Sequence, residues 1–302
     1  MRIGVDLGGT KIEAIALDAT GETRARRRVA TPRGDYRGTV AAIVDLVAGI
    51  ERDLGVRGSV GVGIPGTASP ATGLVENANS TWLIGRALDR DLAAALARPV
   101  RLANDANCFA LSEARDGAAA GADPVFGVIL GTGVGGGLVV AGHPVVGVNA
   151  IAGEWGHNPL PWPKDDERPG PACYCGRAGC IETFLSGPAL ARAYREAGGH
   201  AADPATIAAR AEAGEARAEA VLARHEERLA RALASVVNIL YPAVIVLGGG
   251  LSNIDRLHVR VPALWGRWVF SDRVDTRLVR ASHGDSSGVR GAAWLWPLEE
   301  RS

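Results

Sequence analysis

The sequence predicts an α/β fold of two lobes, and three observations support this expectation. The chain has 302 residues, which is longer than one ordinary domain. Its residues are 47% hydrophobic, which is enough to fill two cores. A pattern of strand, glycine-rich turn, strand, helix, strand and helix occurs twice along the chain. This duplication predicts two related lobes with a ligand cleft between them.

The first half of the chain supplies one copy of the pattern. Ile3 and Val5 alternate with smaller residues up to the Gly8-Gly9 pair, and the alternation resumes at Ile12, so a hairpin is expected. Apolar residues then recur at helical spacing from Val40 onward. The expected elements are strands at 2–6, 12–16, 59–64 and 100–102 and helices at 38–54, 89–97 and 106–119.

The second half repeats the pattern with longer helices. Leu222, Leu229 and Leu233 mark the apolar stripe of a long helix, and Asp203 before Pro204 is typical of a helix start. The expected elements are strands at 125–130, 137–141 and 244–247 and helices at 188–197, 204–212, 215–240 and 287–296.

Three glycine-rich turns follow predicted strands, at 6–11 (DLGGTK), 131–137 (GTGVGGG) and 248–250. The first turn is neither a P-loop nor a dinucleotide-binding fingerprint, because it lacks the GxxxxGK(S/T) pattern and lies in a hairpin instead of at a strand–helix junction. Backbone N–H groups in such turns can form a nest for an anion, and Thr10 and Lys11 add donors to the first turn. One such turn alone is equally typical of an ordinary hairpin. Three of them, each after a strand, favour a nucleotide site.

Asn104 and Asp105 stand at the end of a predicted strand and the start of a predicted helix. One interpretation is a helix N-cap, since Asn and Asp are leading cap residues. The other is a catalytic pair, because phosphoryl transfer to a hydroxyl group needs a carboxylate that takes the proton. An ordinary Asp, with a pKa of about 3.9, is ionised at neutral pH and could serve as this base. The two interpretations are compatible.

Three of the four cysteines, Cys173, Cys175 and Cys180, follow a C-x-C-x₄-C pattern. A redox pair would read C-x-x-C, and a disulfide would leave one cysteine over. Zinc needs a fourth ligand, and His157 on the preceding proline-rich loop is the best candidate. Three thiolates and one imidazole close the coordination sphere, so the predicted zinc is structural. The isolated Cys108 is expected to be a buried free thiol.

Two glutamates flank this predicted zinc site. Glu154 precedes His157 by three positions, and Glu182 follows Cys180 by two. Each could be an ordinary exposed or ion-paired acid. Because a metal would hold the loop still, both are instead interpreted as acceptors for sugar hydroxyls, and the second ring nitrogen of His157 as a further substrate contact.

Composition excludes several function classes. The chain has 33 basic and 33 acidic residues, a balance that is atypical of nucleic-acid or membrane-surface binding. The run of arginines at 24–28 is interpreted as a solvated strand edge. No secretory signal is recognisable, and the most apolar stretch is broken by Asn238 and Pro242. With so few cysteines, a reducing, cytoplasmic setting is expected.

Taken together, the motifs resemble the ROK family of bacterial sugar kinases and related repressors. The resemblance spans positions 6 to 295, and the cysteine motif is its most specific part. In chain order the motifs are DLGGTK, GIPG, NDANC, GTGVGGG, GEWGH, CYCGRAGCIETF, VIVLGGG and GDSSGVRGAAWL.

The resemblance implies a two-lobed, ribonuclease-H-like ATPase fold of the actin, hexokinase and Hsp70 type with an interlobe cleft. It also implies phosphorylation of a hexose 6-hydroxyl with ATP and Mg²⁺. The stretches NSTWLIG and EWGHNPLPW resemble the fructokinase branch most, so fructose is the expected sugar. A kinase for glucose, mannose or an N-acetylated hexose, and a non-catalytic sugar-binding protein, remain alternatives. The repressors carry a DNA-binding segment ahead of the first motif. That motif begins here at Asp6, so no DNA-binding segment is expected. The resemblance also implies a homodimer.

Site roles follow from the resemblance position by position. It implies that Asp105 is the general base. The expected lobes are 1–117, completed by a C-terminal helix at 287–302, and 118–286. The residues implied to bind the nucleotide are Asp6, Gly8, Gly9, Thr10, Lys11, Thr132, Gly133, Gly248, Gly249 and Gly250, and those implied to bind the sugar are Gly66, Asn79, Asn104, Asp105, Glu154, His157 and Glu182.

Overall fold

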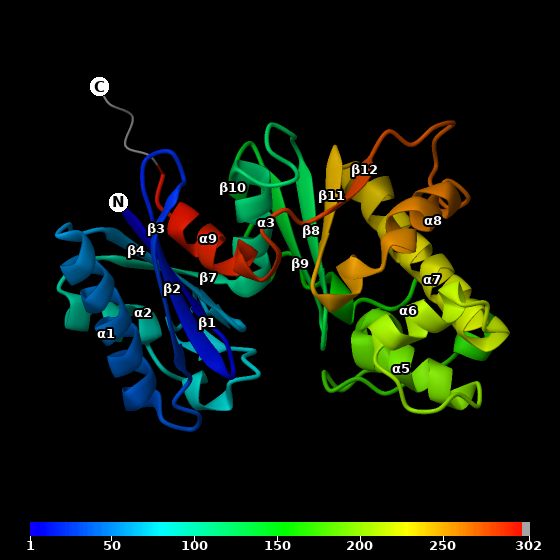
Figure 1. Cartoon of the computed structure of the whole chain (residues 1–302), viewed down its shortest axis with the longest axis horizontal. Helices are drawn as coiled ribbons and strands as arrows, with labels where there is room; N and C mark the ends of the chain where they lie inside the picture. Colours follow the sequence, from blue (N-terminus) through cyan, green and yellow to red (C-terminus); the bar gives the residue numbers. More distant parts are fainter. Residues whose placement is uncertain (298–302) are drawn as a thin grey trace. The chain divides into compact units, whose positions relative to one another are not determined.

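The computed structural model of the chain describes residues 1–297 and contains two five-stranded sheets (Figure 1). The first sheet has the order β3-β2-β1-β4-β7. β1, β2 and β3 form an antiparallel meander, while β4 and β7 run parallel to β1. Its strands are β1 (Arg2–Leu7), β2 (Lys11–Leu17), β3 (Thr23–Ala30), β4 (Ser59–Ile64) and β7 (Val100–Asn104).

Helices pack on both faces of the first sheet. The side chains of Ile3 and Val5 point to one face, where they join a core with α1. Gly4 points to the other face, and a Cβ atom there would lie 2.0 Å from the carbonyl oxygen of Val289 in α9. The absence of a side chain therefore lets α9 lie directly on the strands, where it also packs against α3. The helices are α1 (Tyr36–Leu54), α2 (Leu88–Leu96), α3 (Asp105–Arg115) and α9 (Ser287–Trp294).

The second sheet, β10-β9-β8-β11-β12, repeats the order of the first. β8 and β12 both run parallel to β11, as β1 and β7 do to β4. The predicted duplication is confirmed. Its strands are β8 (Val125–Leu130), β9 (Val134–Val140), β10 (His143–Pro144), β11 (Val244–Gly248) and β12 (Arg277–Arg280), and the helices of this half are α4 (Glu182–Leu185), α5 (Gly187–Glu196), α6 (Pro204–Glu212), α7 (Ala216–Leu240) and α8 (Asp255–Trp265).

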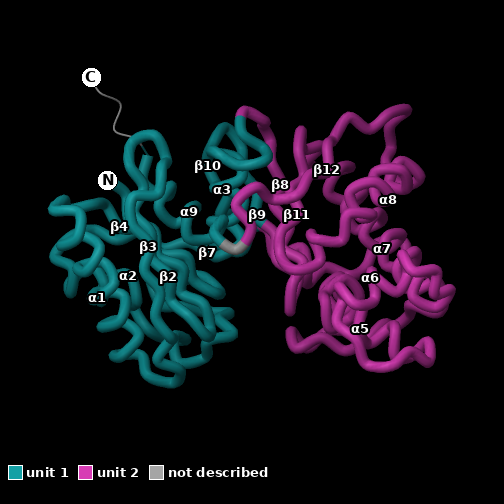
Figure 2. Tube along the Cα trace, in the orientation of Figure 1, with its two compact units in different colours: residues 1–120, 137–152, 285–302 teal, residues 121–136, 153–284 magenta. Residues whose placement is uncertain are grey.

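The chain divides into two compact units, coloured separately in Figure 2. Unit 1 comprises 1–120, 137–152 and 285–302, and unit 2 comprises 121–136 and 153–284. The sequence analysis had assigned 137–152 to the second lobe. In the structure this segment groups with unit 1 because Gly137 lies against α3, where a Cβ atom would be 2.3 Å from the carbonyl oxygen of Ala106. The last helix ends at Trp294, and the expected extension to 302 falls partly outside the described residues.

Two local predictions are confirmed. The arginines at 24–28 belong to β3, an exposed strand at the edge of its sheet. The side chain of Asp203 caps α6 by accepting a hydrogen bond from Thr206. Two short strands, β5 (Thr67–Ala68) and β6 (Val75–Glu76), were not expected. Among the described residues, no helix has both the length and the apolar character needed to cross a bilayer.

Candidate functional site

Two carboxylates meet at one edge of the first sheet. Asp6 in β1 pairs with Gly63 in β4, and Gly63 pairs with Ala103 in β7. Asp105 follows Ala103 by two residues, so it lies just past the end of β7 at the same edge of the sheet. Burial raises the pKa of Asp6 to about 7, and the negative charge of Asp105 acts in the same direction. Carboxyl ends of parallel strands are the usual ligand-binding edge of an α/β sheet. This edge therefore holds concentrated negative charge.

Asn104 caps α3, as one of the two interpretations expected. Its Oδ1 accepts hydrogen bonds from the backbone N–H groups of Ala106 at 2.8 Å and Asn107 at 3.4 Å. Its amide donates to the carbonyl oxygen of Gly66 at 3.1 Å. Asp105, the first residue of the helix, is exposed. Its Oδ1 accepts a hydrogen bond of 2.7 Å from the backbone N–H of Ala106, which holds the carboxylate at the start of α3.

The first glycine turn is held in a defined shape. The N–H of Gly8 donates to the carbonyl oxygen of Lys11 at 3.0 Å. The hydroxyl of Thr31 donates to the carbonyl oxygen of Gly8 at 2.7 Å, and its N–H donates to Thr10 at 3.0 Å. These bonds close the hairpin between β1 and β2, and they leave Thr10 exposed at its tip.

Gly66 and Asn79 lie in the same unit as this turn. Gly66 has φ +76°, and a Cβ atom there would be 2.3 Å from the carbonyl oxygen of Glu76, so only glycine fits. Asn79 is exposed. A Cβ atom at Gly9 would lie 3.8 Å from the hydroxyl oxygen of Ser80. The structure thus brings the segment of Asn79 next to the first glycine turn.

The second and third glycine turns are neighbours in unit 2. Gly248 pairs with Ile129 across β11 and β8, so the turns leave the same edge of the sheet. Gly249 has φ +77°, and a Cβ atom there would be 2.4 Å from the carbonyl oxygen of Leu130. Gly250 begins a short 3₁₀ helix that ends at Asn253. Thr132 and Gly133 are therefore close in space to the segment 248–250.

Glu182 contacts the second glycine turn directly. Its Oε2 accepts a hydrogen bond of 2.9 Å from the backbone N–H of Val134. A Cβ atom at Gly133 would lie 2.5 Å from the same oxygen, so a larger residue there must displace the carboxylate of Glu182. The indole N–H of Trp155 donates to the carbonyl oxygen of Gly135 at 3.2 Å. Sequence reasoning did not identify this contact of Trp155, although the residue stands between Glu154 and His157.

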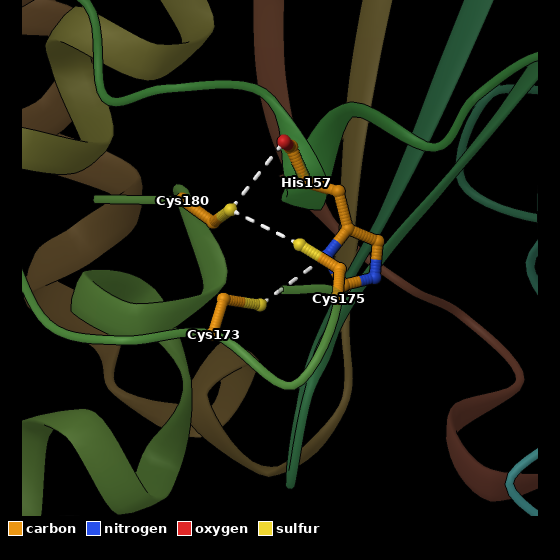
Figure 3. Close-up of side chains that lie close together, drawn as sticks. All are labelled: His157, Cys173, Cys175 and Cys180. Atoms are coloured by element: carbon orange, nitrogen blue, oxygen red, sulfur yellow. Dashed lines mark hydrogen bonds between the residues drawn. The ribbon is translucent and has the colours of Figure 1, made fainter. Parts of the chain in front are cut away.

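Four side chains converge in unit 2 as the sequence predicted, and we call them the His–Cys cluster (Figure 3). They are His157, Cys173, Cys175 and Cys180, and their ligand atoms all lie within 4.8 Å of one another. The sulfur of Cys173 is 3.5 Å from Nδ1 of His157, and the sulfurs of Cys175 and Cys180 are 3.6 Å apart without a disulfide.

The spacing of the cluster fits a tetrahedral zinc ion. Zinc bonds to sulfur and nitrogen imply edges of about 3.8 Å between two sulfurs and about 3.6 Å between sulfur and nitrogen. The two distances above match within a few tenths of an ångström. Hydrogen bonding from the backbone N–H of Arg177 lowers the pKa of Cys175 to about 6, which favours the thiolate that a metal binds. With four protein ligands, no position is left for a catalytic water.

The second nitrogen of His157 has a protein partner. Nε2 lies 3.0 Å from the hydroxyl oxygen of Tyr174, whose ring stands edge-on to the imidazole. Nε2 of His157 therefore faces Tyr174. The sequence had instead suggested that this nitrogen contacts the substrate. Tyr174 was not singled out from the sequence, because one exposed aromatic residue between two cysteines carries no distinctive signal.

Backbone pairing joins the two segments of the cluster. Leu160 donates to Gly179, and Ile181 donates to Asn158, each at 2.9 Å. Glu154 lies just before this pairing and is exposed. Desolvation raises the pKa of Glu154, with Glu182 adding to the effect and His157 opposing it. Glu154, His157 and Glu182 thus interact electrostatically in unit 2.

Two sheets with the same strand order and glycine turns at their strand ends define a class, the actin-like ATPase fold. Solved structures of this class superpose on almost the whole chain. The ROK hexokinase of Thermus thermophilus matches with a TM-score of 0.86 and 33% identity over 97% of this chain and 96% of that chain. A ROK glucokinase of Streptomyces griseus, bound to glucose and AMPPNP, matches with a TM-score of 0.77 and 28% identity over 97% and 98%.

The chain belongs to the ROK family, whose sequence profile matches residues 2–299. Among curated relatives, an N-acetyl-D-glucosamine kinase of Pectobacterium atrosepticum is 41% identical over 98% of this chain and 98% of its own length. The family expected from the motifs is confirmed. The relative carries the name of a different sugar from the one that the fructokinase resemblance suggested.

Proposed function

We propose that this protein is an ATP-dependent sugar kinase that phosphorylates N-acetylglucosamine at its 6-hydroxyl group. The single observation that carries the sugar is the 41% identity, along the whole chain, to a relative named N-acetyl-D-glucosamine kinase. Kinase chemistry is supported independently by Asp105, exposed at the ligand-binding edge of its sheet, and by three glycine turns at strand ends. N-acetylglucosamine replaces fructose as the main substrate, and fructose is kept as a competitor in the test.

In this proposal Asp105 is the general base. Its carboxylate accepts the proton of the sugar hydroxyl as that oxygen attacks the terminal phosphorus of ATP. Asn104 positions Asp105 by capping α3 and by its bond to Gly66, so that the base stands at a fixed helix end.

The glycine turns are assigned to ATP. Gly9, Thr10 and Lys11 of the first turn and Thr132-Gly133 of the second are assigned to the phosphates, while the N–H of Gly8 closes the first turn by donating to Lys11. Gly248 to Gly250 are assigned to the adenosine part. Mg²⁺ prefers oxygen ligands, and Asp6 offers a carboxylate where its repulsion with Asp105 favours a cation. When bound, the ion would neutralise charge on the transferring phosphoryl group.

Sugar hydroxyls are assigned to Gly66, Asn79, Asn104, Glu154 and Glu182, whereas both ring nitrogens of His157 already have protein partners. Carboxylate and amide oxygens accept hydrogen bonds from hydroxyls, and the raised pKa of Glu154 reflects a crowded, partly desolvated position suited to such a contact. The zinc implied by the His–Cys cluster would act through structure, holding the loop that carries Glu182.

The test is a sugar panel with the purified full chain, ATP and Mg²⁺. ADP release is measured with N-acetylglucosamine, N-acetylmannosamine, glucose, mannose and fructose, and the values of kcat/KM are ranked. Phosphorus NMR of the product identifies the phosphorylated hydroxyl. N-acetylglucosamine is expected to rank first. A higher value for fructose would restore the fructokinase assignment, and calorimetric sugar binding without ADP release would rule out the kinase.

A further inference from the structure

A cavity of about 690 Å³ lies in unit 2, and none of the residues assigned above lines it. Its walls come from the segment 166–171, from Phe184, and from the facing sides of α5 and α7. Its size falls in the range of small-molecule sites. The proposed kinase reaction makes no use of it.

The lining of the cavity has an excess of positive charge. Five arginines face it, against the two acidic residues Asp166 and Glu196. Like charges held together in one cavity repel each other unless an anion joins them. Burial lowers the pKa of Arg228, the hydrogen bond to Glu167 opposes this shift, and the charges of Arg224 and Arg231 add to it. The five lining arginines are Arg168, Arg192, Arg217, Arg224 and Arg228.

Two of these arginines are already committed to carboxylates. Arg224 is 2.6 Å from Asp166, and Arg228 is 2.8 Å from the buried Glu167. Their distances are those of charge-assisted hydrogen bonds. These pairs neutralise two of the five guanidinium groups.

The other three arginines are held loosely by their acidic neighbours. The distance from the guanidinium nitrogen to the nearest carboxylate oxygen is 3.9 Å for Arg168, 3.7 Å for Arg192 and 4.0 Å for Arg217. All three distances are longer than a hydrogen bond. One nitrogen of Arg192 also donates to the carbonyl oxygen of Thr183. Guanidinium groups retain several N–H donors each, so donors remain for a ligand.

Apolar groups complete the walls. Phe184, Val221, Pro169 and Pro171 line the cavity, and the guanidinium of Arg228 lies 4.9 Å from the ring centre of Phe184. A bare ion would contact only the arginines. A ligand with a carbon body would also cover the apolar groups, and this combination of a few charged donors with apolar walls is typical of metabolite sites.

We propose that this cavity is a second ligand site that binds a small organic oxyanion. Arginine recognises phosphate and carboxylate groups with paired N–H donors, so both phosphate esters and polycarboxylates share the required chemistry. Arg168 and Arg217 bind the charged group, and Phe184 and Val221 contact its carbon skeleton. The site does not depend on the proposed sugar substrate.

The cavity adjoins the His–Cys cluster without sharing its ligands. The N–H of Gly179 donates to the carbonyl oxygen of Pro171 at 2.9 Å, so one cavity wall is bonded to the segment between Cys175 and Cys180. Thr183, which accepts from Arg192, follows Glu182 in α4. A ligand in the cavity therefore binds next to the segment that carries Glu182.

The test is isothermal titration of the full chain with two probes, inorganic phosphate and citrate, at low ionic strength and with AMPPNP and sugar present to fill the kinase site. The double variant Arg168→Ala and Arg217→Ala is expected to weaken binding about tenfold or more, since each removes charged donors. Arg195→Ala, an exposed arginine of α5 outside the cavity, is the matched control. It is expected to bind like the unmodified chain.

The two probes distinguish the source of the anion. Tighter binding of phosphate assigns a phosphorylated metabolite, and tighter binding of citrate assigns a polycarboxylate; either result supports the site. Arg217→Glu, which reverses the charge of a half-exposed side chain, provides a second variant if the double variant unfolds. Absence of binding by both probes, or equal affinities in the unmodified chain and the cavity variants, overturns the proposal.

Discussion

The carboxylate of Glu182 accepts a hydrogen bond of 2.9 Å from the backbone N–H of Val134. This bond joins the loop that follows the His–Cys cluster to the second glycine turn, although the two residues are far apart in the sequence. A group assigned to the sugar thus also shapes a turn assigned to phosphate.

Gly133→Ala tests this link. A Cβ atom at position 133 would lie 2.5 Å from the carboxylate of Glu182 and must displace it. We expect a loss of about 1.5–3 kcal/mol in the free energy of unfolding, typical of a lost hydrogen bond to a charged group, because the displaced carboxylate leaves the N–H of Val134, together with weaker ATP binding. Urea unfolding and calorimetry measure the two effects. Gly131→Ala in the same turn is the matched control, because a Cβ atom there meets nothing within 4 Å. Equal unfolding free energies in the two variants would contradict the steric argument.

Asp105→Asn is expected to lower kcat by about 10²–10⁴-fold, because an amide cannot take the hydroxyl proton. Thermal unfolding should change little, since the side chain is exposed and Asn104 supplies the cap of α3. Steady-state kinetics with saturating sugar and ATP measure the loss. Asp45→Asn, an exposed residue of α1, is the control and should retain kcat. Nearly full turnover of Asp105→Asn would remove the general-base assignment.

The His–Cys cluster predicts one zinc ion per chain in the purified protein, measured by elemental analysis. Cys175→Ser, or chelation, should release the metal and lower thermal stability and sugar affinity together, because the loop carrying Glu182 loses its anchor. Cys108→Ala changes the buried free thiol of α3 and should keep the zinc content unchanged. Fully active protein without bound metal would disprove the structural role.

Glu167 predicts an acid-sensitive contribution to stability. Burial alone would raise its pKa, but hydrogen bonds from Arg228, from the backbone N–H of Lys164 and from Arg231 lower it to about 2 from an ordinary value of 4.5. The folded state therefore binds fewer protons than the unfolded state between these values. The resulting stability is complete above about pH 5, and it is lost as the pH falls from 4.5 toward 2.

Glu167→Gln should destabilise the chain by about 3–5 kcal/mol near neutral pH, since buried Arg231 loses its charged partner. The difference in unfolding free energy between the variant and the unmodified chain should shrink as the pH falls from 4.5 toward 2. Urea unfolding at a series of pH values measures it. Asp165→Asn, a fully exposed neighbour, is the control without such an effect. A difference that does not depend on pH would show that charge at Glu167 is unimportant.

Sequence patterns predicted most elements of the fold but missed α8. Leu257, Val261 and Trp265 are buried at helical spacing, so a signal was present. Pro262 within the helix interrupts the pattern, because proline is normally excluded from helix interiors. The structure retains the helix because its apolar face packs against α7. Tertiary packing here outweighs a local preference.

The substrate shows a different limit of motif reading. The stretches that resembled fructokinases lie beside assigned site residues, yet a relative that is similar along the whole chain is named an N-acetyl-D-glucosamine kinase. Short motifs indicate the chemistry that all kinases of this family share, the transfer of a phosphoryl group from ATP to a hydroxyl group. Discrimination between hexoses depends on the shape of a pocket, to which many positions contribute a little each.

The sequence alone determined the features that rest on local chemistry. The spacing of Cys173, Cys175 and Cys180 selects zinc-like ligation, and glycines after strands predict anion-binding turns, because ligand type and backbone freedom belong to neighbouring residues. The tertiary structure alone decided which distant groups meet. The approach of Asp6 to Asp105, the bond from Val134 to Glu182 and the cavity lined by Arg168, Arg192 and Arg217 all depend on strand order and helix packing, which no short stretch of sequence encodes.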